Sequence, residues 1–338
     1  METIGLIILT FLLIGLGLDI VSKKYFVTCK LNHSTTTCIK GISIFIIILS
    51  HIGGNLGTRL FTPLGGIGVA MFLFLSGYGL SKSYAKNQLS FYWRKRFIAI
   101  YPAYFIASIV AWIVNGVTDV KTILLGMTFV QPAIPYGWYF QYLLLWYAIF
   151  WVSGFVHSDK WKWAILLTCA AISFCFLPEI MAEQSASFIL GVFVATKEGL
   201  IAKYVAENKK VFISFGLMLL GIVTLSIKQF EIVRNAPQII FNGVQLLIKL
   251  PIAIGIIAFV LSRYINTHLK FQGFYLLGSI SYELYLLHGM CINSIHSTGI
   301  IYIMIALLLS IIFARLLNVI NELLGKKLQN ILIESWKR

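Results

Sequence analysis

Charged side chains are scarce in this chain, and acidic ones are the scarcest. Only 12% of the 338 residues are charged, with 12 Asp and Glu against 27 Lys and Arg. Soluble domains carry about 25% charged residues. The five cysteines give no disulfide framework, and the group Cys29, His33 and Cys38 is an incomplete set of zinc ligands. The composition therefore excludes a separate soluble domain, and we predict no metal.

Long apolar runs take the place of the missing charge. Hydrophobic residues make up 59% of the chain, and its mean hydropathy is +0.88. The runs are continuous instead of alternating every second residue, which predicts helices and not a membrane barrel. We expect an all-α, polytopic membrane protein with about eleven transmembrane helices, each long enough for a core of about 30 Å. The predicted spans cover residues 4–21, 39–53, 64–80, 97–117, 139–156, 163–180, 186–200, 210–227, 239–262, 272–292 and 299–320.

The distribution of the net charge of +15 indicates a membrane topology and argues against nucleic-acid binding. Of the 27 Lys and Arg residues, 21 fall in one set of alternate connections and 4 in the other. Because basic loops stay in the cytoplasm, we predict an outside N-terminus and a cytoplasmic C-terminus. The first apolar run lacks a basic n-region and a small-residue cleavage site, which favours a retained helix over a signal peptide.

His51 is an ionisable residue near the far end of the apolar run that follows Lys40. A helical rise of about 1.5 Å per residue places it about 16 Å from Lys40, in the outer half of the bilayer. A second histidine, His288, lies at a similar depth in the predicted span 272–292. Histidine suits proton transfer near neutral pH. The residue type leaves two interpretations open, a helix–helix hydrogen bond and a catalytic base.

A basic cluster, Arg94 to Arg96, stands where the predicted span 97–117 enters the membrane. Arg94 and Arg96 suit a phosphorylated cytoplasmic ligand, because guanidinium groups bind phosphate bidentately. Lys95 reads more simply as a topology anchor. The segment 65–80 is rich in glycine, which indicates close helix packing or room for a long ligand.

Two charged residues of opposite sign, Lys249 and Glu283, fall at comparable depths in two predicted spans. Each would be costly if it were unpaired in the membrane. We therefore expect them to form an ion pair.

Several motifs, in this order, resemble those of the acyltransferase type 3 family of integral membrane acyltransferases. A basic residue, ten intervening residues and a histidine are present as Lys40 and His51, with Lys where Arg is more usual. A glycine-bearing helix then ends in Ser76-Gly77-Tyr78. The late segment Ile280 to His288, which contains Tyr282 and Tyr285, closely resembles the family's late helix.

Two further motifs match the family in part. The aromatic residue, basic cluster and proline of the family are present as Phe91, Arg94 to Arg96 and Pro102, but Ala99 stands where a further Arg is common. Trp138-Tyr139 resembles the family's Trp-bearing segment, although Leu143 replaces a Glu. The resemblance covers residues 39–320. It implies a ten-helix core, with residues 1–38 as an added transmembrane helix and cytoplasmic loop, and with 321–338 as a cytoplasmic tail.

The resemblance implies transfer of an acyl group, usually acetyl, from cytoplasmic acyl-CoA to a sugar hydroxyl on the outer side of a bacterial inner membrane. The acceptor is a surface polysaccharide or a lipid-linked glycan. His51 is the implied base or acyl carrier, supported by His288. The donor is expected to contact Lys40, Arg94, Lys95 and Arg96, and the further polar site residues are Ser76, Tyr78, Trp138, Lys249, Tyr282, Glu283 and Tyr285.

Two other functions fit the sequence. The glycine-rich helix, the intramembrane Lys249 and Glu283, and the proline in span 97–117 are compatible with a transporter or exporter of a glycan or lipid intermediate. A non-catalytic partner in a glycan-assembly complex is the third possibility. A transporter has no need of a CoA phosphate site, so the basic cluster together with His51 favours the enzyme.

Overall fold

The computed structural model describes residues 5, 6, 9, 31–199, 201, 209–262, 272–294 and 300–334. Regular structure within these ranges is entirely helical, which confirms the predicted all-α class. The predicted first span, 4–21, and most of the segment 1–38 lie outside the described residues. The chain divides into two compact units, one containing Thr3–Gln88 and Trp146–Ser279 and the other containing Leu89–Leu145 and Ile280–Arg338. We call them the first and the second unit.

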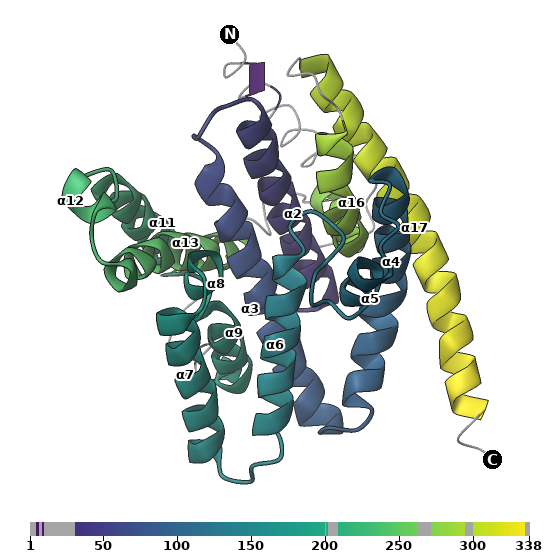
Figure 1. Cartoon of the computed structure of the whole chain (residues 1–338). Coiled ribbons are helices and arrows are strands. Elements are labelled where there is room, and N and C mark those ends of the chain that lie inside the picture. The colour runs from purple at the N-terminus through teal and green to yellow at the C-terminus, as the bar shows by residue number, and fades with distance from the viewer. Residues whose placement is uncertain are drawn as a thin grey trace. The chain divides into compact units, whose positions relative to one another are not determined.

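The first unit contains most of the helices (Figure 1). They are α2 (His33–Asn55), α3 (Thr62–Asn87), α7 (Asp159–Phe176), α8 (Glu179–Ala182), α9 (Ser187–Thr196), α11 (Lys209–Ile227), α12 (Glu231–Arg234), α13 (Gln238–Val260), α15 (Gln272–Ser279) and the second half of α6 (Trp138–Ser153).

Helix α2 begins at a side-chain cap, because the Asn32 carboxamide accepts a hydrogen bond from the Thr35 backbone N–H at 2.9 Å. It packs against α15 with almost no space between the backbones. A Cβ atom on Gly41 of α2 would lie 1.8 Å from the Phe274 carbonyl oxygen, and one on Gly278 of α15 would lie 1.8 Å from the Thr37 carbonyl oxygen. Glycine is therefore required on both helices at this crossing.

Helices α3 and α9 cross in the same reciprocal way. A Cβ atom on Gly77 would lie 2.1 Å from the Phe188 carbonyl oxygen, and one on Gly191 would lie 2.0 Å from the Phe74 carbonyl oxygen. The glycine-rich segment 65–80 thus serves close packing, one of the two roles that its composition allows.

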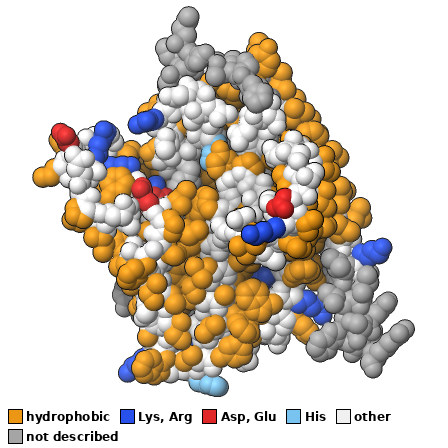
Figure 2. Space-filling model, in the orientation of Figure 1, with side chains coloured by type: hydrophobic (Ala, Val, Ile, Leu, Met, Phe, Trp, Pro, Cys, Tyr) orange, Lys and Arg blue, Asp and Glu red, His pale blue; other side chains and the backbone are white. Residues whose placement is uncertain are grey.

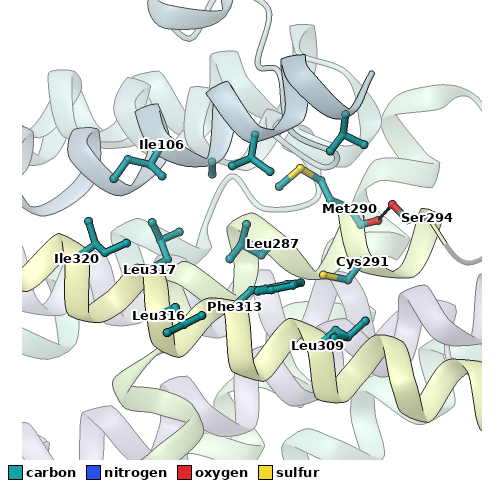
Figure 3. A pocket seen from close by; sticks show the side chains of 13 residues that line it. Ile106, Leu287, Met290, Cys291, Ser294, Leu309, Phe313, Leu316, Leu317 and Ile320 are labelled. Carbon is teal, nitrogen blue, oxygen red and sulfur yellow. Dashed lines mark hydrogen bonds between the residues drawn. The ribbon is translucent and has the colours of Figure 1, made fainter. Parts of the chain in front are cut away.

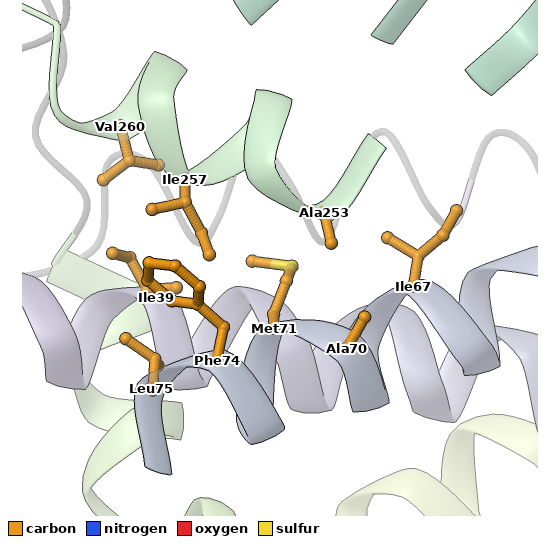
Figure 4. Close-up of a cluster of buried hydrophobic side chains, with 9 residues drawn as sticks. All are labelled: Ile39, Ile67, Ala70, Met71, Phe74, Leu75, Ala253, Ile257 and Val260. Atoms are coloured by element: carbon orange, nitrogen blue, oxygen red, sulfur yellow. The ribbon is translucent and has the colours of Figure 1, made fainter. Parts of the chain in front are cut away.

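The core of the first unit lies where α13 passes beside α2 and α3 (Figure 4). Ala253, Ile257 and Val260 of α13 pack on a row of α3 side chains that runs from Ile67 to Leu75. Pro251 lies inside α13, just before this contact. Proline removes a backbone donor from a helix and is a common cause of kinks.

The second unit contains α4 (Tyr92–Val114), α5 (Val120–Met127), the first half of α6, α16 (Ser281–Asn293) and α17 (Ile300–Glu334). The short helix α5 covers the apolar stretch near residue 122 and folds back on α4. Its end is fixed there by the Tyr104 hydroxyl, which donates to the Gly126 carbonyl at 2.7 Å. The Phe129 ring stacks on the Tyr104 ring with 4.0 Å between centroids.

Six of the described helices are long and apolar enough to cross a membrane: α2, α3, α4, α11, α13 and α17. Hydrophobic side chains are spread over much of the visible face of the protein and charged side chains are few there, as expected of a lipid-facing surface (Figure 2). Helix α9 has ten residues, so it extends for about 15 Å and does not cross the bilayer alone. Six candidate spans are therefore found among the described residues, and the total of about eleven stays a prediction.

The predicted span 272–292 was wrong as a single helix, because it is divided at Ile280 into α15 and α16. The Ser279 hydroxyl donates to the Leu276 carbonyl at 2.7 Å. Such local side-chain bonds compete with continuation of a helix. The two pieces also pack against different partners, α15 against α2 and α16 against α17.

Candidate active site

Helix α2 carries the predicted Lys40 and His51 on one uninterrupted helix of 23 residues. Lys40 is exposed and His51 is half-buried. The residue before His51 is fixed to the start of α3, since the Ser50 hydroxyl donates to the Thr62 carbonyl at 3.1 Å. The end of α2 that bears the histidine is thus tied to the first turn of α3.

Helix α3 places Ser76 half-buried and Tyr78 buried. The Tyr78 hydroxyl donates to the Glu198 carboxylate at 3.0 Å, and Lys82 forms an ion pair with the same carboxylate. The sequence did not single out Glu198. Its signal is its position two residues after the end of an apolar helix that has no other acidic residue.

Lys249 does not pair with Glu283, and that prediction is wrong. Its ammonium group forms an ion pair with Glu183, which lies in the turn between α8 and α9. Both side chains are buried, with 8% of Lys249 and 3% of Glu183 exposed. The reason is that the connection after α7 folds into the first unit. Its turn between α8 and α9 brings the Glu183 carboxylate next to the Lys249 ammonium group.

Glu283 has amide partners on α17. The Asn321 and Asn318 side chains donate to its carboxylate at 3.1 and 3.4 Å. Glu283 is 3% exposed, and the two amide donors satisfy part of the hydrogen-bonding capacity of its carboxylate. The neighbouring Tyr282 hydroxyl donates to the Ile100 carbonyl of α4 at 2.6 Å, close to Pro102.

The basic cluster occupies the first turn of α4. The Arg96 guanidinium lies 4.0 Å from the centre of the Tyr92 ring and donates to the Tyr92 carbonyl at 2.9 Å. The Arg94 guanidinium lies 5.2 Å from the centre of the Phe91 ring. Lys95 is exposed. Cation–π contact thus orients each guanidinium along its own helix, and no acidic residue lies in that turn.

His288 is completely buried in a group of aromatic rings in the second unit. Its Nδ1 atom lies 2.9 Å from the Tyr285 carbonyl and 3.0 Å from the Leu284 carbonyl. Because a carbonyl only accepts, Nδ1 carries the proton in the neutral ring and the lone pair lies on Nε2. The Tyr136 ring stacks on the imidazole with 5.6 Å between centroids.

The same aromatic group includes other predicted residues. The Tyr285 hydroxyl donates to the Tyr136 carbonyl at 3.1 Å, and the Tyr139 and Tyr285 rings lie 5.0 Å apart. Trp138 contacts Tyr139 edge-on at 6.5 Å. Sequence reasoning missed Tyr136, whose signal is its place in the aromatic run that also contains Trp138. Burial raises the pKa of its phenol, which stays a neutral donor.

An apolar cavity of 420 Å³ lies within the second unit, between α4, α16 and α17 (Figure 3). Leu287, Met290 and Cys291 of α16 face Phe313 and other apolar side chains of α17. The Ser294 hydroxyl at its edge donates to the Met290 carbonyl at 2.8 Å. The lining suits a hydrocarbon chain better than a sugar, because it offers few polar partners.

The predicted residues thus fall into groups within each unit. In the first unit, Lys40 and His51 share one helix, and Lys249 contacts the start of α3. In the second, Trp138, Tyr285 and His288 share one aromatic group, while Arg94 and Arg96 lie at the start of α4. Among the described residues, no group of three His, Cys, Asp or Glu side chains could hold a metal ion.

Comparison with known proteins identifies the family. No curated protein and no solved structure matches the chain significantly. The profile described as an acyltransferase domain, that of the acyltransferase type 3 family, matches residues 37–320. The matched region begins just before Lys40 and extends beyond Arg315, so it contains every motif on which the resemblance was based. The chain therefore belongs to the acyltransferase type 3 family of membrane acyltransferases.

Proposed function

We propose that this protein is an O-acyltransferase, moving an acetyl group from cytoplasmic acetyl-CoA to a hydroxyl of a surface polysaccharide or a lipid-linked glycan. Family membership carries the proposal, since it is the observation that specifies acyl transfer. In the proposed arrangement, the protein lies in a bacterial inner membrane, with its N-terminus outside and its C-terminus in the cytoplasm. No metal takes part.

The proposed donor contacts are Lys40, Arg94, Lys95 and Arg96. The three residues of the basic cluster lie within the first five residues of α4, where the helix dipole adds to their attraction for phosphate. Arg94 and Arg96 supply charge-assisted hydrogen bonds, and Lys95 contributes charge. Lys40 lies on α2 in the first unit.

His51 is the proposed base. In direct transfer, the acceptor hydroxyl attacks the thioester carbonyl while His51 takes its proton, the C–S bond breaks, and the proton passes to the departing CoA thiolate. In the covalent alternative, the imidazole carries the acyl group between the two substrates. His288 is proposed to orient the acceptor and not to take part in the chemistry. The hydroxyl-bearing residues Ser76 and Tyr78 of the first unit, and Tyr282 and Tyr285 of the second, are the further proposed substrate contacts.

The direct test uses purified protein in lipid nanodiscs. Binding of acetyl-CoA, followed by release of free CoA that depends on added glycan, is the expected result. Hydrolysis without a glycan is subtracted as background. Glycan movement across a proteoliposome membrane with no CoA release would instead identify a transporter.

A further inference from the structure

A buried ion pair in the first unit has no role in the proposed chemistry. Lys249 of α13 and Glu183 of the α8–α9 turn form it, and both side chains are almost completely buried. The neighbouring turn residues Gln184 and Ser185 are buried as well. Burying two charges away from water costs free energy. The segments that the pair contacts therefore indicate what role it has.

The ion pair and the neighbouring Gln184 all contact Gly66 of α3. The Gln184 side chain donates to the Gly66 carbonyl at 3.0 Å. A Cβ atom on Gly66 would lie 2.5 Å from Lys249 Cδ and 3.1 Å from Glu183 Oε1. The lysine stem and the carboxylate thus rest directly on the backbone of the first turns of α3.

The same turns of α3 also contact the end of α2. A Cβ atom on Gly65 would lie 2.9 Å from Ser50 Oγ. The Ser50 hydroxyl donates to the Thr62 carbonyl at 3.1 Å. Ser50 immediately precedes His51, so the first turns of α3 contact both the ion pair and the segment that carries the histidine.

We propose that the Lys249–Glu183 pair, together with Gln184, is a brace that sets the position of His51 through the first turn of α3. Lys249 and Glu183 are then positioning residues for the reaction. The inference rests on the proposed role of His51. Displacement of a reacting group by about 1 Å can lower a rate by about 100-fold. A brace that sets the position of His51 can therefore affect turnover although it contacts neither substrate.

The main experiment replaces the pair in the full-length protein with apolar residues, Lys249→Met together with Glu183→Leu. Neither charge is then left uncompensated, so the variant should unfold close to the wild-type temperature. We expect an unchanged KM for acetyl-CoA and a kcat reduced by about tenfold to 100-fold. A second readout follows the rate at which diethyl pyrocarbonate modifies His51, measured by peptide mass spectrometry across pH, and we expect that rate profile to change.

Gly66→Ala is an independent variant that keeps both charges and pushes the lysine stem away from α3. It should lower kcat and alter His51 modification in the same direction as the double replacement. Matched controls act on the same helix away from the brace. Gly79→Ala adds a Cβ where nothing lies within 4 Å, and Lys82→Met removes the ion pair with Glu198. Both controls should leave His51 modification unchanged.

Wild-type kcat and wild-type His51 modification in a folded double variant would overturn the brace and leave the pair with a purely stabilising role. If the double variant does not fold, the kcat and the His51 modification of Gly66→Ala test the brace in the same way. The modification readout needs no turnover, so it still tests the brace if the wild-type protein releases no CoA with any acceptor. That last result would count against the proposed function alone.

Discussion

Removal of the His51 imidazole separates chemistry from binding. His51→Ala should lower turnover by about 10²–10⁴-fold, because that is the usual contribution of a general base. The variant should stay folded and bind acetyl-CoA, since the proposed phosphate contacts lie on other residues. Turnover is measured at saturating donor, after thermal unfolding has been checked.

Two other histidines, His288 and His157, serve as comparisons for the His51→Ala variant. His288→Ala should be milder than His51→Ala, because we assign His288 to a supporting role. His157→Ala removes an exposed imidazole between α6 and α7 and should leave turnover unchanged. Near-normal turnover in folded His51→Ala would refute the mechanism, and a loss confined to His288→Ala would reverse the two assignments.

The arginines of the basic cluster should act on donor affinity. Arg94→Ala or Arg96→Ala should each weaken acetyl-CoA binding by about tenfold or more, because a charge-assisted hydrogen bond is worth about 1.5–3 kcal/mol. Arg96→Lys should restore only part of the affinity, since Lys cannot make a bidentate contact. Binding is measured by titration calorimetry in nanodiscs.

Lys95→Ala is the matched control for these arginines, because it removes one positive charge from the same turn. It should weaken binding less than either arginine variant. Equal losses at all three positions would mean that the cluster acts through net charge alone. Unchanged affinity in the double arginine variant would remove the proposed phosphate contact entirely.

At the scale of helices, the close crossings make a prediction about stability. Gly77→Ala places a Cβ 2.1 Å from the Phe188 carbonyl oxygen, so α3 and α9 must move apart. Overpacking of this kind costs about 1–3 kcal/mol, and the unfolding temperature should fall. Gly191→Ala at the same crossing should not add its full cost, because neighbouring sites are not independent.

Gly79→Ala is again the natural control, since it lies on α3 in open space. It should unfold at or slightly above the wild-type temperature, because alanine is the better helix former. Equal unfolding temperatures for the Gly77 and Gly79 variants would show that α3 and α9 tolerate a wider crossing.

Hydropathy predicted well where these helices lie in the sequence. It predicted poorly which side chains and helices contact one another. A helix was expected and found around His51 and around Lys249, because continuous apolar runs fix where a helix lies in the sequence. Depth along a span, however, says nothing about which way a side chain points around the helix. Lys249 was therefore given the wrong partner, Glu283, when Glu183 of a buried turn was within reach. The break at Ile280 was missed for a similar reason, since it depends on which helices the two pieces contact.

At the scale of the whole molecule, the predicted topology can be tested by labelling single cysteines from outside the cell. Single cysteines replace the exposed residues Thr118 and Ser158 in a background without the native cysteines. An impermeant maleimide added to intact cells should label residue 118 and miss residue 158, because positively charged connections remain in the cytoplasm. The reverse pattern would contradict the proposed orientation, and labelling of both would remove a span between them.

The sequence predicts individual site residues better than it predicts how they are arranged. The motifs single out Lys40, His51 and His288, each by its spacing within one helix, and the roles of these residues stay predictions. The contacts of His288 with Tyr136, and of Tyr78 with Glu198, join segments far apart in the chain. No periodicity within one segment encodes such contacts.

The first turn of α4 also bears on how the protein behaves in the test tube. Three positive charges stand at the positive end of α4, whose N-cap residue is Phe91, a side chain that cannot cap a helix by hydrogen bonding. The dipole adds about half an elementary charge of the same sign, so this end repels itself when no anion is bound. An anion that binds only the folded state at 100 times its Kd stabilises it by about 2.7 kcal/mol. Preparations in low-salt buffer without polyanions should therefore be the shortest-lived, and CoA should act as a preservative even where no acceptor is present.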